Sequence, residues 1–416
     1  MNNKVFLRQI SILRSQHQKT VMNASVLMVT RGGQIALGLL TTYVLANTLS
    51  MEKYGQYQFI LSVIGIVSIF SLTEFANTLM QSVARGYRGS LRKMLPYPML
   101  SSLIGSLTLV ACAYLYGIKD DNTQIALCFI FAALFLPFTH GLRIWVGVKI
   151  GEEKFLDYSK TELLTLACTN IGIIGTVLLI PDKYIGAVLF VMLIPAIVNI
   201  LMITRLLKLI PKDDAVESGV IGHGIKSSFY MAFSKVSNHI DKVLLFMFVD
   251  AVSVALLVAA DRVSDLLRSA IQDLSTALAP EFAKTEAYTK KTDNFFKMSC
   301  LIFGVFMILF AFIALPHLLV LIYGEDYKEA IIYAQIFIVV LSISNLASFQ
   351  FRYIRSKLDT QNVRNIMMVT SLSRIAMSLT FVPFMGLHGA VLSTVLYHLI
   401  LTAMTDYRIR KDYLVA

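Results

Sequence analysis

Long apolar stretches recur along the whole chain and are separated by short polar segments. A helix needs about 20 apolar residues to span the hydrocarbon core of a bilayer. This rule predicts an all-α membrane protein with about twelve transmembrane helices. They are expected near residues 24–47, 57–83, 94–116, 124–147, 160–180, 184–204, 225–249, 251–279, 298–322, 329–351, 364–384 and 388–407.

The composition supports this pattern. Hydrophobic residues make up 56% of the chain and charged residues 15%, so it is too apolar for an average soluble domain. The formal net charge of +11 would suit nucleic acid only if the basic residues shared one water-facing surface. They occur instead in small groups between apolar stretches, so no nucleic-acid partner is expected. The four cysteines lack metal-ligand spacing, and no metal or other cofactor is predicted.

Lysine and arginine alternate between successive predicted loops, as the positive-inside rule requires. The loops and termini on one side carry 27 of the 37 basic residues, whereas the opposite loops carry Lys53, Lys119, Lys183 and Lys328. This alternation predicts an even number of crossings with both termini in the cytoplasm. We therefore expect a multi-pass membrane protein.

Short motifs recur between the two halves, roughly 200 residues apart, as in transporters built from two parallel repeats. Gly186-Ala187-Val188 matches Gly389-Ala390-Val391, and Tyr116-Gly117 matches Tyr323-Gly324. The predicted domains are an amphipathic cytoplasmic segment (1–20), a six-helix bundle (21–210), a cytoplasmic linker (211–224), a second six-helix bundle (225–407) and a cytoplasmic tail (408–416).

Ionisable residues at membrane depth cost about 2.5–3.5 kcal/mol each on insertion scales, so they are expected to face protein or a hydrated cavity. The densest group lies on the predicted helix 251–279, where Asp261, Asp265, Arg268 and Gln272 share one helical face, with Arg262 and Asp273 beside it. We expect a central cleft with net cationic walls. The predicted cavity-lining residues are Gln34, Asn77, Gln81, Asn238, His239, Asp241 and Gln272.

Arginine is suited to phosphate because its planar fork of donors matches phosphate oxygens and stays charged. A cationic cleft therefore suits a phosphate-bearing substrate. Alternatively, Arg262 pairs with Asp265, and Arg268 pairs with Asp261 or Asp265, as internal salt bridges. Glu74 is either a proton or cation site or a carboxyl that hydrogen-bonds to Asn77. Three other residues, His140, Arg143 and Arg374, are expected to lie near the cytoplasmic interface and snorkel to headgroups.

Enzyme signatures are scarce: the sequence has no P-loop, HExxH or GxSxG motif, and we expect no catalytic residues and no enzyme activity. Two acidic spacings resemble half of a metal-diphosphate site, namely Asp213-Asp214 with Glu217, and Asp261 with Asp265. Each lacks its partner motif. An intramembrane prenyl or glycosyl transferase is therefore only a secondary alternative.

Four segments resemble those of Wzx-type polysaccharide or O-antigen flippases, within the multidrug/oligosaccharidyl-lipid/polysaccharide exporter superfamily. They are Ile322–Ala330, Gly386–Ala390, Asp250–Arg262, and Met51–Tyr57 before the second helix. Two departures are Ala255, where such proteins often have glycine, and Leu257, where they usually have tyrosine.

The resemblance implies two six-helix bundles in a V-shaped, alternating-access transporter of the bacterial cytoplasmic (inner) membrane. Its expected substrate is a polyprenyl-diphosphate-linked oligosaccharide, and its expected partners are membrane lipid and the polysaccharide polymerase machinery. A multidrug cation antiporter of the same fold is the main alternative. The hypothesis assigns diphosphate binding to Arg31, Lys235, Arg262 and Arg268, and ion coupling to Glu74, Asp261 and Asp265.

Overall fold

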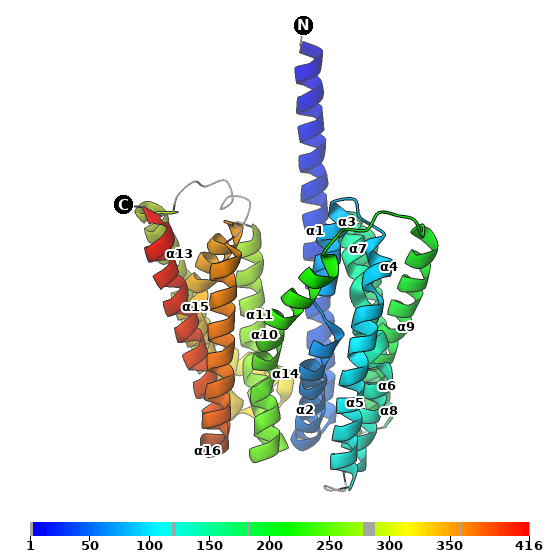
Figure 1. Ribbon diagram of the computed structural model, residues 1–416. Coiled ribbons are helices and arrows are strands. Elements are labelled where there is room, and N and C mark those ends of the chain that lie inside the picture. The colour runs from blue at the N-terminus through cyan, green and yellow to red at the C-terminus, as the bar shows by residue number, and fades with distance from the viewer. Residues whose placement is uncertain (1–2, 119–121, 181–182, 278–287, 358, 416) are drawn as a thin grey trace. The chain divides into compact units, whose positions relative to one another are not determined.

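The protein is almost entirely helical in its computed structural model, which describes residues 3–118, 122–180, 183–277, 288–357 and 359–415 (Figure 1). The strands among these residues are β1 (Tyr288–Thr289) and β2 (Leu414–Val415), which pair in parallel. The fold class predicted from the hydropathy pattern is therefore confirmed.

A helix occurs in each of the twelve predicted segments. The first half contains α1 (Asn3–Thr48), α2 (Met51–Val67), η1 (Ser68–Ser71), α3 (Phe75–Ala84), α4 (Ser90–Met94), α5 (Pro96–Ile118), α6 (Thr123–Thr139), η2 (Gly141–Ile144), α7 (Trp145–Gly151), α8 (Phe155–Leu179) and α9 (Ile185–Leu209). The second half contains α10 (Val220–Phe248), α11 (Ala251–Ala277), α13 (Lys290–Ile313), α14 (Leu315–Tyr323), η3 (Glu325–Tyr327), α15 (Ala330–Ser356), α16 (Thr360–Arg408) and η4 (Ile409–Tyr413).

Several predicted helices are interrupted. The expected helix 57–83 is divided into α2 and α3 by η1 and by Leu72, whose φ of 46° is left-handed. The helix expected at 298–322 breaks at Ala314, two residues before Pro316, which cannot donate a backbone hydrogen bond. The two helices expected at 364–384 and 388–407 are both present within α16, and they are separated at Gly386, whose φ of 57° and ψ of −132° are not helical.

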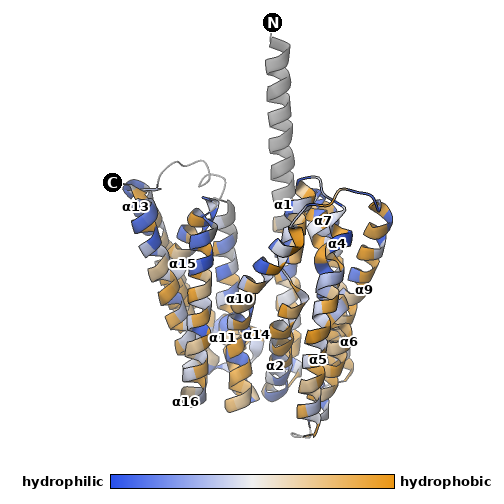
Figure 2. Ribbon diagram, in the orientation of Figure 1, coloured by the Kyte–Doolittle hydropathy of each residue, from blue (hydrophilic) through white to orange (hydrophobic). Residues whose placement is uncertain are grey.

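Eight helical stretches among the described residues are long and apolar enough to cross a membrane. One of them, Gln361–Tyr413, covers the last two predicted crossings. Two long helices of the second half, α10 and α11, do not meet this criterion. They carry most of the ionisable residues that the sequence placed at membrane depth. Figure 2 shows hydrophilic positions among apolar ones along these two helices. These two helices are therefore the first place to look for a functional site.

Contacts divide the chain into two compact units that are not contiguous in sequence. The first comprises Met1–Thr41, Phe70–Thr176 and Ile185–Ser228, and the second Thr42–Ile69, Val177–Tyr184 and Phe229–Ala416. Residues of α2 thus pack with the second unit, where α2 contacts α11. The predicted division into bundles 21–210 and 225–407 stays a prediction.

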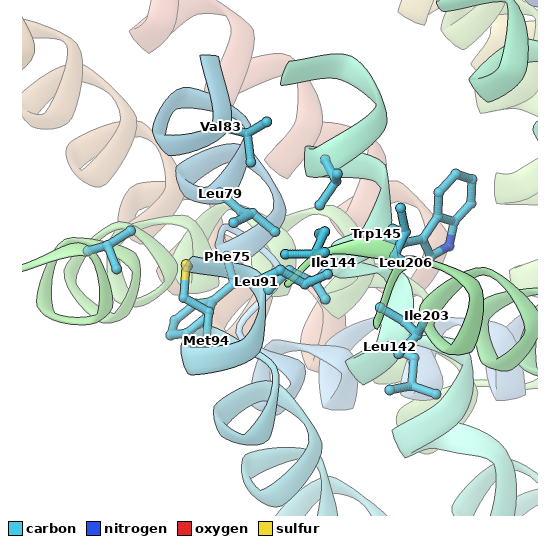
Figure 3. Close-up of a cluster of buried hydrophobic side chains, with 13 residues drawn as sticks. Phe75, Leu79, Val83, Leu91, Met94, Leu142, Ile144, Trp145, Ile203 and Leu206 are labelled. Carbon is cyan, nitrogen blue, oxygen red and sulfur yellow. The ribbon is translucent and has the colours of Figure 1, made fainter. Parts of the chain in front are cut away.

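The first unit has a well-packed core that joins α3, α4, α7 and α9 (Figure 3). Phe75, Leu79 and Leu91 are fully buried in it, and Trp145 donates a hydrogen bond of 2.7 Å from Nε1 to Asn199 Oδ1. Between membrane helices, such cores are stabilised by van der Waals packing of closely fitting side chains and by interhelical hydrogen bonds. This core gives the first unit a defined internal packing.

The connection between α9 and α10 is bound to the first unit. Arg85 forms a salt bridge of 2.7 Å with Glu217, and the Gly89 amide donates to the Ala215 carbonyl over 3.1 Å. The hydrogen bond from Arg85 lowers the pKa of the Glu217 carboxyl. Because α10 already begins at Val220, the connection is shorter than the predicted linker 211–224.

Candidate functional site in the polar interior of the second unit

The polar face of α11 is organised around Arg268. Its Nη1 donates to Asp265 Oδ1 over 2.7 Å, and its Nη2 lies 3.7 Å from Asp261 Oδ1. The internal salt bridges considered from the sequence are confirmed for Arg268. Arg262, in contrast, forms no ion pair with any described residue. Its Nε is buried and has no hydrogen-bond partner among the described residues.

A second ion pair connects α10 to α16. Arg374 Nη2 donates to Asp241 Oδ2 over 2.9 Å, and the Ser378 hydroxyl donates to the other oxygen of the same carboxylate. Arg374 also lies 3.4 Å from the Thr394 hydroxyl and 5.2 Å from the centroid of the Tyr397 ring.

Arg374 is only 9% exposed and Asp241 only 3%. The prediction that Arg374 snorkels to the cytoplasmic interface is therefore wrong, because its charge is neutralised inside the protein. The sequence offered one signal for this role, the position of an arginine within an apolar stretch. It gave no indication of the partner, since Asp241 lies on another helix.

His398 connects the α11 face to α15. Its Nε2 lies 3.5 Å from Arg268 Nη2, and its Nδ1 lies 3.2 Å from the Ser344 hydroxyl. The side chain is buried. Sequence analysis showed no sign of this role, because the partners of the His398 ring, Arg268 and Ser344, lie on other helices.

The remaining candidates of the second unit lie on α10 and at the end of α11. Lys235 Nζ donates to Ser68 Oγ over 3.1 Å, and the His239 ring packs against Gly65 of α2. Asn238 and Gln272 are exposed. The side chain of Asp273, expected beside the α11 face, lies outside the described residues.

Positive charge exceeds negative charge in this region. Asp261 and Asp265 lie within electrostatic range of Lys242 as well as Arg268, and His239 lies within range of Lys235, Lys242 and Arg374. We call this group the polar interior. Among the described side chains it contains five cations (Lys235, Lys242, Arg262, Arg268 and Arg374) and three carboxylates (Asp241, Asp261 and Asp265).

The other sequence candidates lie in the first unit. Arg31 and Gln34 are on α1, with Arg31 exposed. Glu74 precedes α3 and accepts a hydrogen bond of 2.9 Å from Asn77, and both Asn77 and Gln81 are exposed on α3. The bond between Glu74 and Asn77 matches the structural alternative considered for that carboxyl.

Two predicted interface residues also lie in the first unit, at the junction of α6 and η2. Arg143 forms a salt bridge of 2.8 Å with Glu162, and it lies with Arg31 within electrostatic range of Tyr158. His140 is partly buried. Arg143 thus combines a half-exposed side chain with a specific carboxylate partner on α8.

An almost entirely helical chain with many apolar spans and ion pairs between its helices has the architecture of a multi-pass membrane transporter. The family is more specific: the chain belongs to the polysaccharide biosynthesis protein family, whose model matches residues 20–286. The resemblance stated from the sequence is therefore confirmed. No curated protein sequence gives a significant match.

Solved structures of several transporters share the fold. An inward-closed structure of the lipid II flippase MurJ aligns over 93% of this chain and 87% of its own, with 16% identity and a TM-score of 0.62. An inward-facing multidrug resistance MATE family transporter aligns over 91% and 94%, with 15% identity and a TM-score of 0.64. A MOP superfamily transporter from Pyrococcus furiosus, described as having a binding pocket of reverse polarity, aligns over 94% of this chain and 95% of its own, with 14% identity and a TM-score of 0.58.

Proposed function

We propose that this protein is a flippase that moves polyprenyl-diphosphate-linked oligosaccharide units across the bacterial cytoplasmic membrane by alternating access. The carried unit would belong to O-antigen or another surface polysaccharide. Membership of the polysaccharide biosynthesis protein family supports this function, and so does a fold shared with a lipid II flippase. Both termini would lie in the cytoplasm, and the protein would be a transporter with no enzyme activity.

The observation that carries the proposal is the surplus of cations in the polar interior. Asp261 and Asp265 neutralise Arg268, and Asp241 neutralises Arg374, but Arg262 has no carboxylate partner among the described residues. A diphosphate would supply the missing negative charge and accept the planar donors of a guanidinium. We therefore assign substrate binding first to Arg262, with Arg268, Lys235 and Arg31 as further proposed contacts.

A multidrug cation antiporter is the second candidate, since structures of that kind share the fold. An organic cation would need accessible carboxylates, whereas Asp241, Asp261 and Asp265 each face an arginine within salt-bridge distance. The charge balance therefore favours an anionic substrate. Glu74, Asp261 and Asp265 remain our proposals for ion coupling, and contact with the polymerase machinery remains a proposed partnership.

The test is export of lipid-linked glycan by an Arg262→Gln variant in cells that lack their own flippase. Losing one charge-assisted contact to phosphate should reduce export roughly tenfold or more. Arg262→Lys keeps the charge but not the planar fork and should retain part of the activity.

The matched control is Arg364→Gln, which removes an exposed arginine of α16 outside the polar interior. Full export by a normally inserted Arg262→Gln protein would disprove the assignment of diphosphate binding to this residue. Transport of organic cations, combined with loss of transport on neutralising Asp261 or Asp265, would support the antiporter instead.

A further inference from the structure

A separate cavity of about 290 Å³ lies within the second unit, between α10, α11, α15 and α16. Its lining includes Arg352 and Arg355 of α15, together with Gln272 of α11 and Tyr397 of α16. Arg262 and Arg268 do not line it. The cavity is therefore a different site from the one formed by the arginines to which we assign diphosphate binding.

The lining is cationic and rich in hydrogen-bond donors. Arg352 and Arg355 are one helical turn apart, and none of the described lining residues is a carboxylate. A phosphate between these two side chains would lie within reach of both guanidinium groups, whose planar donors match phosphate oxygens. Hydroxyl groups from three further helices face the same space, including those of Ser234, Ser275 and Ser371.

The position of the cavity indicates where its ligand would enter. Arg352 and Arg355 lie in the last turns of α15, which ends at Ser356. The distribution of loop charges predicts that this end faces the cytoplasm, close to the anionic headgroups of the inner leaflet. The volume lies at the lower limit of small-molecule sites, which suits a compact polar group and not a glycan chain.

We propose that this cavity binds one phosphate-bearing headgroup, held by the guanidinium groups of Arg352 and Arg355 and by the surrounding hydroxyls. Two sources have this chemistry: an anionic glycerophospholipid of the inner leaflet and a soluble organic phosphate. In either case, the ligand would stabilise the packing of α15 against α11 and α16, because it contacts all three helices.

The test compares thermal unfolding of the purified, delipidated protein with three added probes. Phosphatidylglycerol carries the headgroup and acyl chains, diacylglycerol carries the chains alone, and glycerol 3-phosphate carries the phosphate alone. We expect phosphatidylglycerol to raise the unfolding temperature and diacylglycerol to leave it unchanged. A shift with phosphatidylglycerol alone identifies a lipid ligand, and an equal shift with glycerol phosphate identifies a soluble one.

Variants separate a built site from general surface charge. In Arg352→Gln/Arg355→Gln, the apparent affinity for the phosphate-bearing probe should fall at least roughly tenfold. Arg364→Gln/Lys411→Gln removes two exposed cations outside the cavity and should bind like the wild type. Ser371→Leu keeps every charge but fills part of the cavity, and it should also weaken binding.

The proposal fails if diacylglycerol produces the same shift as phosphatidylglycerol. It also fails if the Arg352→Gln/Arg355→Gln protein binds the phosphate-bearing probes as tightly as the wild type. Gel-filtration profiles of the detergent-solubilised variants show whether each one is folded before binding is compared. Because Arg262 is intact in all of them, these outcomes are independent of the proposed transport function.

Discussion

Individual charged residues differ in how completely their partners neutralise them. Arg374 is buried and has the Asp241 carboxylate at 2.9 Å, whereas Arg262 has no ion pair within the described part of the chain. A buried charge without a partner costs several kcal/mol after relaxation. Arg374 therefore has a structural function, and Arg262 is better placed to bind an incoming anion.

The first prediction concerns this buried pair. Replacing Arg374 with alanine leaves Asp241 as an uncompensated buried carboxylate, which should destabilise the protein by about 3–5 kcal/mol. Thermal unfolding in detergent, followed by intrinsic fluorescence, measures the effect.

Asp241→Asn/Arg374→Gln, which removes both charges, should be more stable than Arg374→Ala alone. If Arg374→Ala unfolds at the wild-type temperature, the pair contributes nothing to stability. Lys208→Ala serves as the control, since Lys208 is exposed on α9 and its loss should change stability by less than about 0.5 kcal/mol.

For individual residues, the sequence predicted correctly only those groups whose members lie on the same helix. Asp261, Asp265 and Arg268 were grouped correctly because a helical period places them on one face. Arg374 was misplaced and His398 was omitted because their partners, Asp241 and Ser344, lie on other helices. Spacing along one helix carries no information about such pairs.

Close approach of helix backbones determines how the elements of the second unit pack. A Cβ atom added at Gly55 of α2 would lie 1.8 Å from the carbonyl oxygen of Ala251, at the start of α11. No side chain fits at that distance. The segment Met51–Tyr57, expected to precede the second helix, instead forms the first turns of α2 and packs against α11 through this glycine.

The second prediction follows from this contact. Gly55→Ala should separate α2 from α11 or prevent their packing, and we expect a loss of about 1–3 kcal/mol, as for an overpacked core. Gly175→Ala in α8 is the matched control, because no atom lies within 4 Å of its added Cβ. Thermal unfolding of the two variants should differ clearly, and equal stability would contradict the close contact.

The sequence located helices more reliably than it located their interruptions. Pro316 marked the break between α13 and α14, but nothing in the residue type of Leu72 indicates a left-handed backbone. The repeated motif Gly-Ala-Val was placed correctly in both halves. Ala187 and Ala390 are both fully buried, Gly186 lies in the first turn of α9, and Gly389 lies just after the break at Gly386, at the start of the second helix of α16.

For the whole molecule, the distribution of basic residues remains the basis for the predicted orientation of the chain in the membrane.

The third prediction tests this orientation with reporter fusions. Alkaline phosphatase fused after Asn122, at the start of α6, should be active because that loop is predicted to lie outside the cytoplasm. A fusion after Lys357, at the end of α15, should be inactive, and a green fluorescent reporter should give the opposite pattern. An active phosphatase at Lys357 would overturn the orientation.

The break at Gly386 has a mechanical consequence. Gly386 adopts φ 57° and ψ −132°, a conformation that interrupts α16 and divides it into two helices. Arg374 of the first helix lies 3.4 Å from the Thr394 hydroxyl of the second, and Asn362 donates to Asp412 far from the glycine on either side. The two helices are therefore folded back against each other. Because contacts join them along their length, the pair should move as one unit during any change of conformation.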